Sequence, residues 1–172
     1  MNIFVLDEDP VLAAQMHCDK HMKMVLESAQ LLSTAVFLMA REAKAEELVN
    51  KQYPLIYKPT HQHHPCTLWT ASNSARYNWL RDLGLALCAE YTFRYGRQHK
   101  SEAVIRSLTC PIRGDQPLKP FALAMPDECK TDDAMQSYRN YYLAAKQSIL
   151  VYTRRQPPTW IPAGMARWKG SK

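Results

Sequence analysis

The chain of 172 residues is long enough for one domain with an adequate hydrophobic core. Its hydrophobic fraction of 47% and charged fraction of 22% are typical of a soluble globular protein, and no run approaches the roughly 18 apolar residues of a membrane span. The net charge of +6 favours an anionic partner such as a nucleic acid.

Cysteine usage and the first residues bear on the cellular compartment. The five cysteines are an odd number and contain no Cys-x-x-Cys pair. The start of the chain lacks the basic region and the small-residue cleavage site of a signal peptide. We therefore expect a cytoplasmic monomer with reduced thiols and no contact with a membrane.

The first half of the chain predicts two long helices. Residues 2–6 read as a short strand or extended arm, and Asp9 followed by Pro10 is a typical helix start. We expect this first helix to run to about residue 48, with a break near residue 40. A proline-containing loop over 50–66 precedes a second helix at 67–95, which Gly96 ends.

The second half predicts a short helix, a long loop and a last helix. Ser101 is placed to cap a helix that ends near residue 108, and residues 110–130 contain four prolines and read as an irregular connection. Asp132 and Asp133 mark the start of a final helix to about residue 153. The prediction is an all-α single domain over 1–172, with three main helices, a short one, long loops and an extended N-terminal arm.

Residues 15–30 combine ionisable side chains with a pattern typical of a buried helix. At about 100° per residue one stripe collects six side chains, which are His17, Lys20, His21, Met24, Glu27 and Leu31. Ionisable groups on such a helix must be paired, and displaced pKa values of this kind are common at active sites. The alternative is a buried structural network, in which Glu27 pairs with a lysine of its own helix.

Histidines supply the remaining candidates. His61, His63 and His64 lie in the loop before the second helix, and we expect His64 to meet His17, Lys20, His21 and Glu27 in one pocket; the alternative is a solvated loop. The spacing of His17 and His21 suits a metal, but the glutamate of His-Glu-x-x-His is absent and Lys20 would repel a cation. We expect no metal and no cofactor.

Arginines interleaved with tyrosine and tryptophan occur in two segments, a mixture suited to phosphates and unstacked bases. The tryptophans and about half of the tyrosines also fit a core. The residues expected to contact DNA are Lys23, Arg76, Asn78, Arg94, Tyr138, Arg139 and Trp160.

Short motifs resemble two groups of phage proteins. The extended start before Ala14-Gln15, the His64-Pro65 pair and the tail from Gln156 to Trp160 resemble the bacteriophage pyrimidine-dimer DNA glycosylases of the endonuclease V type. The motifs His-Cys-Asp-Lys-His at 17–21, His-Pro-Cys at 64–66 and Ala-Met-Pro-Asp-Glu at 124–128 are similar to an uncharacterised phage-encoded family.

The glycosylase resemblance implies a mechanism. In that family an N-terminal amine attacks the sugar carbon as the base leaves, forming an imine, and a glutamate of the first helix is essential. Glu27 matches that glutamate, and the amine of Met1 or of Lys20 would be the nucleophile. Protons would pass through His17, His21 and His64.

We therefore expect a DNA glycosylase or AP-lyase-like enzyme that works on a base or its glycosidic bond, with DNA as partner. Two alternatives stay open. One is a nucleotide-modifying or DNA base-modifying group-transfer enzyme. The other is a non-catalytic nucleic-acid-binding protein.

Overall fold

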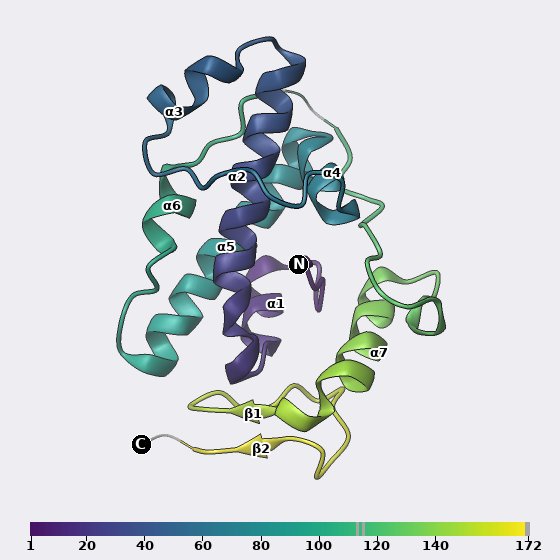
Figure 1. The fold of residues 1–172 in the computed structure, drawn as a ribbon. Helices are drawn as coiled ribbons and strands as arrows, with labels where there is room; N and C mark the ends of the chain where they lie inside the picture. Colours follow the sequence, from purple (N-terminus) through teal and green to yellow (C-terminus); the bar gives the residue numbers. More distant parts are fainter. Residues whose placement is uncertain (113, 115, 171–172) are drawn as a thin grey trace.

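The fold is all-α, as the sequence predicts, and a computed structural model describes residues 1–112, 114 and 116–170. The helix over Met24–Glu42, α2, lies at the centre of the fold and packs against α4 and α5 (Figure 1). The helices are α1 (Pro10–Met16), α2 (Met24–Glu42), α3 (Val49–Gln52), α4 (Pro65–Ala71), α5 (Ser74–Tyr95), α6 (Glu102–Ser107) and α7 (Ala134–Lys146). The described residues also form the 3-10 turns η1 (Asp19–Lys23), η2 (Glu46–Leu48), η3 (Asp127–Cys129) and η4 (Gln147–Ile149).

Local sequence signals set several helix ends. Asp9 caps α1 and Asp133 caps α7 by accepting backbone N–H bonds in each first turn. Gly96 ends α5 with φ at 67°, a left-handed conformation that glycine adopts without a steric penalty. The Ser101 side chain caps nothing and instead accepts a hydrogen bond from the Tyr57 hydroxyl at 3.1 Å.

The predicted first helix is wrong, because the chain divides it at His17 and Cys18. α1 ends at Met16, His17 is extended (φ −70°, ψ 135°), and α2 begins only after the η1 turn. The Cys18 N–H donates to the Tyr142 hydroxyl at 2.7 Å, a bond that a continuous helix would not permit. His17, Lys20 and His21 therefore share no helical stripe with Glu27.

Two further boundaries differ from the prediction. The second helix is divided into α4 and α5, because Asn73 is extended and uses its side chain to cap α5. The last helix ends at Lys146, and the tail returns to form a small parallel pair, β1 (Val151–Tyr152) with β2 (Arg167–Trp168). The first boundary is set by a local cap, whereas the second depends on pairing between two segments of the tail.

The helical core depends on close approach between α2, α5 and α6. Gly84 of α5 lies where these helices meet, and a Cβ there would be 3.1 Å from the Ile105 Cδ1 and 3.2 Å from the Ser28 Cβ. Within the described residues one stretch, Asp19–Glu42, has the length and composition of a membrane span, but 72% of its apolar window is buried in the protein. Such burial is typical of the core helix of a soluble protein.

A buried ionic network connects α1, η1, α5 and the tail. The Arg94 guanidinium, buried in full, donates to the Glu90 carboxylate at 2.8 Å, to the Asp19 carboxylate at 3.2 Å and to the Gln15 carbonyl at 3.1 Å. Arg155 from the tail donates to the second oxygen of Glu90 at 2.7 Å. Every charge in this network has an opposite partner, which offsets the cost of desolvation.

Replacing Arg94 with alanine should lower the free energy of unfolding by about 3–5 kcal/mol, because it leaves the buried Glu90 and the half-buried Asp19 short of a partner. Urea denaturation followed by circular dichroism measures this loss. Arg97→Ala, three residues along the chain at an exposed position, is the matched control and should change stability by less than about 0.5 kcal/mol. Equal losses in both variants would contradict a structural role for Arg94.

Candidate active site

The N-terminal arm is held in place by Phe4. Its ring is buried, lies edge-on to His21 with 4.3 Å between ring centroids, and stacks on Tyr141 at 5.5 Å. The Lys146 ammonium lies 5.7 Å from the Phe4 ring. Because Phe4 is anchored on several sides, the three residues before it follow a defined path over the surface of α2.

Asn2 directs the arm toward Glu27. Its side-chain Nδ2 donates to the Ala124 carbonyl at 2.7 Å, and its Oδ1 accepts the Ile3 N–H at 2.8 Å. The Asn2 backbone N–H donates to the Glu27 Oε2 at 3.1 Å. Asn2 therefore links the arm both to the loop before η3 and to the Glu27 carboxylate of α2.

Glu27 lies between two amines. The terminal amine of Met1 is 3.8 Å from its Oε2, and the Lys23 ammonium is 2.8 Å from its Oε1. The Glu27 side chain is 14% exposed, so that solvent reaches it only in part. A carboxylate in this position can take a proton from the terminal amine or stabilise a positive charge beside it.

His64 belongs to the same corner of the molecule. Its Nδ1 accepts the Cys66 N–H at 3.2 Å and so caps α4, which leaves the proton of the neutral ring on Nε2. Partial burial lowers the pKa of His64, the terminal amine and His61 lower it further, and Glu27 opposes them. At neutral pH His64 is therefore a neutral donor near the amine.

Cys66 is not a second nucleophile at this corner. Its Sγ donates to the Asn2 Oδ1 at 3.7 Å, and burial raises the pKa of the thiol to about 11. A thiol with this pKa is protonated at neutral pH and reacts slowly.

The structure separates three of the five residues that were expected in one pocket. His17 and His21 are buried beside Phe4 and Tyr142, and their rings stack with centroids 5.0 Å apart. Burial lowers the pKa of His17 to about 4 and that of His21 well below its usual value, so both are neutral at pH 7. Lys20 is exposed, which removes the burial that was expected to activate its amine.

Two of the predicted DNA contacts are wrong because the side chains are buried. Tyr138 has no exposed surface and donates to the Ala122 carbonyl, and Arg94 is 3% exposed. Tyr138 and Tyr142 of α7 are buried and Tyr141 is half-buried, so this tyrosine-rich turn packs against the core and does not face solvent. Asn78 and Lys23 are exposed.

Two more of the predicted DNA contacts, Arg76 and Arg139, are bound to backbone carbonyls of other segments. The Arg76 guanidinium donates to the carbonyls of Leu118 and Lys119, and that of Arg139 donates to the Leu6 carbonyl. Arg139 also lies over the ring of Trp160, with 5.7 Å between its Cζ and the ring centroid. Neither guanidinium is freely available to a phosphate.

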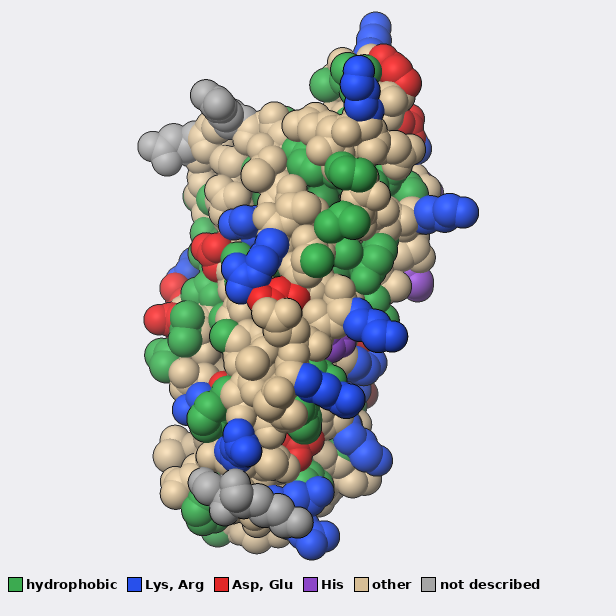
Figure 2. All heavy atoms as spheres, turned by 90° about the vertical axis from the view of Figure 1, so that its left-hand side faces the viewer, with side chains coloured by type: hydrophobic (Ala, Val, Ile, Leu, Met, Phe, Trp, Pro, Cys, Tyr) green, Lys and Arg blue, Asp and Glu red, His purple; other side chains and the backbone are tan. Residues whose placement is uncertain are grey.

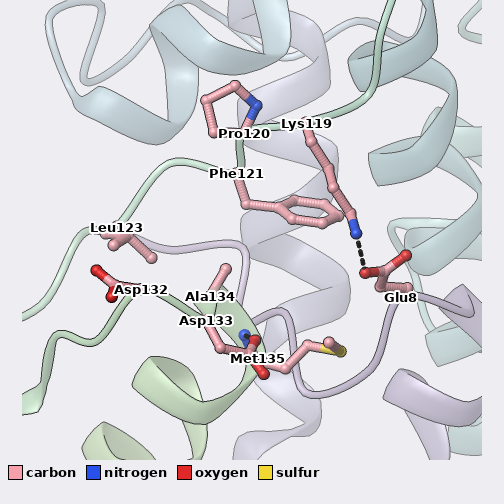
Figure 3. A pocket seen from close by; sticks show the side chains of 9 residues that line it. All are labelled: Glu8, Lys119, Pro120, Phe121, Leu123, Asp132, Asp133, Ala134 and Met135. Carbon is pink, nitrogen blue, oxygen red and sulfur yellow. Dashed lines mark hydrogen bonds and ion pairs between the residues drawn. The ribbon is translucent and has the colours of Figure 1, made fainter.

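Two hollows flank this region. Residues 59–64 line an open hollow of about 550 Å³ that includes His64. A separate pocket of about 410 Å³ lies between Phe121 and the start of α7, with an ion pair of Lys119 and Glu8 at its edge (Figure 3). None of the residues that surround the terminal amine lines this second pocket. Among the described residues no group of three or more His, Cys, Asp or Glu side chains is arranged to hold a metal.

Acidification should destabilise the protein through His17. Its pKa is about 4 in the folded state and near 6.5 in the unfolded chain, so the unfolded state binds the additional proton between these values. We expect His17 alone to account for a loss of about 2 kcal/mol in unfolding free energy from pH 7 to pH 5.

Denaturation of the wild type and of His17→Leu at both pH values measures this contribution. The fall should be smaller by about that amount in His17→Leu and unchanged in His63→Gln, which alters an exposed imidazole. An equal fall in His17→Leu and in the wild type would show that His17 is not the titrating group.

Comparison with known proteins adds no relative to this description. No family model, curated protein or solved structure matches the chain. The amine, the carboxylate and their surroundings are the features of the molecule that bear on its function.

Proposed function

We propose that the chain is a DNA glycosylase with AP-lyase-like chemistry, in which the terminal amine of Met1 is the nucleophile and Glu27 the essential carboxylate. The observation that carries the proposal is the 3.8 Å separation between the Met1 nitrogen and the Glu27 Oε2, at a carboxylate that is 14% exposed. An amine next to a carboxylate is the minimum that imine chemistry on a sugar requires.

The reaction balances with these two groups. Glu27 takes a proton from the ammonium, and the amine lone pair forms a bond to C1′ of the sugar. The bond from C1′ to the base breaks, and its electron pair leaves with the base, which takes up a proton. The amine then loses its second proton, its lone pair forms the second bond to C1′ as the C1′–O4′ bond breaks, and O4′ takes up that proton, which gives a protonated imine and a sugar hydroxyl.

Neighbouring side chains support these steps. Lys23 occupies one Glu27 oxygen at 2.8 Å, so the other oxygen is directed to the arm. His64 carries its proton on Nε2 and is suited to donate a hydrogen bond to a substrate oxygen or to the departing base. The buried pair His17 and His21 acts on this chemistry only indirectly, by seating Phe4.

The setting of the enzyme follows from its thiols. All five cysteines are free, as a reducing compartment requires. This supports the proposal of a cytoplasmic enzyme, and we propose separately that it is a monomer whose partner is DNA.

Borohydride trapping tests the amine chemistry directly. Incubation with duplexes that contain an abasic site or a damaged base, followed by reduction, should give a covalent protein–DNA adduct, because only an imine is reduced to a stable bond. Mass spectrometry should place the adduct on the amine of Met1. Trapping at Lys20, or the absence of any adduct across the panel, would contradict the proposal.

Glu27→Gln should lower turnover by at least about 10²-fold while leaving DNA affinity close to that of the wild type. Glu47→Gln is the matched control, since it removes an exposed carboxylate far along the chain from Glu27. A variant with one residue added before Met1 should lose trapping, because its amine no longer lies beside the carboxylate. Full activity in Glu27→Gln would leave the group-transfer enzyme or the binding protein as the better description.

A further inference from the structure

The arginines predicted from the sequence to bind DNA phosphates are engaged within the protein, so the surface that binds phosphates has to lie elsewhere. Of the three arginines singled out, Arg94 is buried in an ionic network, and Arg76 and Arg139 are bound to backbone carbonyls. A DNA enzyme needs cations that are free to meet phosphates. Exposed lysine and arginine side chains elsewhere on the molecule are the candidates for this role.

Exposed cations gather where η1, the end of α5 and α6 meet, and we call this region the α5–α6 surface. Its cations are Lys23, Arg97, Lys100 and Arg106, all of them exposed. On the face that turns this side of the molecule to the viewer, many Lys and Arg side chains lie over the lower half, with few Asp and Glu among them (Figure 2). Within the described residues no carboxylate lies within 4 Å of Arg97 or Lys100.

Two hollows open on this surface and share His99. The first, of about 190 Å³, is lined in part by Lys23, Tyr95 and Arg97. The second, of about 360 Å³, lies beyond His99 and is lined in part by Lys100 and Arg106. His99 lines both hollows, so they adjoin each other, and we refer to the two together as the depression.

The carboxylates at this depression are already paired with cations and hydrogen-bond donors of the protein itself. The Asp19 carboxylate accepts from Arg94 at 3.2 Å and from the Thr153 backbone and hydroxyl at 3.0 and 2.8 Å. Glu102 is 8% exposed and is paired with Arg106 at 2.6 Å. The depression therefore carries a net positive charge from Arg97 and Lys100.

An aromatic face lies inside the first hollow. The Tyr91 and Tyr95 rings meet at 4.7 Å, the Tyr91 and His99 rings at 4.9 Å, and Tyr95 is 37% exposed. The Tyr95 hydroxyl donates to the Asp19 carbonyl at 3.2 Å, which fixes the ring. A fixed and exposed tyrosine beside cations is the arrangement that stacks an unpaired base while phosphates are bound nearby.

Lys23 connects this depression with the terminal amine. It lines the first hollow and also contacts Glu27 at 2.8 Å, and Glu27 contacts the Met1 amine. The Lys23 side chain therefore reaches from the first hollow to the Glu27 carboxylate.

We infer that the α5–α6 surface binds the DNA strand next to the attacked nucleotide, with Arg97 and Lys100 on its phosphates and Tyr95 under an unpaired base. This inference rests on the proposed function, because it supplies the strand on which the amine acts. The chemical class of the ligand is a single-stranded or locally unpaired polydeoxynucleotide.

Fluorescence anisotropy with a labelled single-stranded DNA tests the surface without any reaction. In the Glu27→Gln background, the double variant Arg97→Ala/Lys100→Ala should raise the Kd by at least about 10-fold and lower the salt slope of log Kd by about 1.4, two phosphates at about 0.7 each. The control Lys44→Ala/Lys51→Ala removes the same charge from exposed positions beyond the end of α2 and should leave the Kd within about 2-fold.

The aromatic contact has its own test. Tyr95→Ala should weaken binding by about 10-fold and Tyr95→Phe by less than about 2-fold, since both tyrosine and phenylalanine offer a π-face. Thermal melting of each variant establishes that it is folded. An RNA of the same sequence serves as the competing ligand and should bind no more tightly than DNA.

The outcomes separate this inference from the proposed function. The assignment of this surface to DNA would be contradicted by equal losses of affinity in the two double variants or by unchanged binding in Arg97→Ala/Lys100→Ala. Tighter binding of RNA, or no DNA binding by the wild type, would contradict it as well. If binding is salt-sensitive and depends on Arg97 and Lys100 but no adduct is trapped, the DNA-binding surface is supported and only the proposed amine chemistry is contradicted.

Discussion

The contact between Arg94 and Asp19 is the interaction on which the arrangement of the site depends. It draws the η1 turn against α5, and the same Asp19 carboxylate holds Thr153 of the tail. With η1 fixed, α2 starts at Met24 and brings Glu27 to the N-terminal arm instead of to the buried histidines. Charges in a core of this kind are tolerated only when each has its partner, and Glu90 with Arg155 completes the set.

The N-terminal arm reaches Glu27 because the Phe4 ring packs against the neutral imidazoles of His17 and His21. Phe4 adopts a positive φ of 37°, an uncommon conformation for a residue with a side chain, and packing against His21 and Tyr141 holds it there. A protonated imidazole in this apolar setting would be costly, which explains why both histidines remain neutral. Their contribution to the proposed chemistry is thus positional.

The cations of this basic protein divide into two kinds. Arg76, Arg94 and Arg139 fasten loops and termini by donating to carbonyls and carboxylates, a task suited to the planar guanidinium. Arg97 and Lys100 extend from the turn after α5 into solvent, so a ligand that binds them has to displace only water. The number of positive charges alone does not distinguish these roles, because the difference lies in what each side chain contacts.

The sequence by itself determined the all-α class and those helix ends that depend on neighbouring residues, such as the caps at Asp9 and Asp133 and the stop at Gly96. It also singled out Glu27, since a carboxylate among apolar residues is conspicuous in any helix. Only the tertiary structure decided that the helix breaks at His17, where no glycine or proline marks the site, because the Tyr142 hydroxyl and Arg94 act from far along the chain. The nearness of the Met1 amine to Glu27 likewise depends on Phe4 packing, and which arginines are free depends on carbonyls that belong to other segments. Local signals act within one helical turn, whereas these contacts form between residues that only the folded chain brings together.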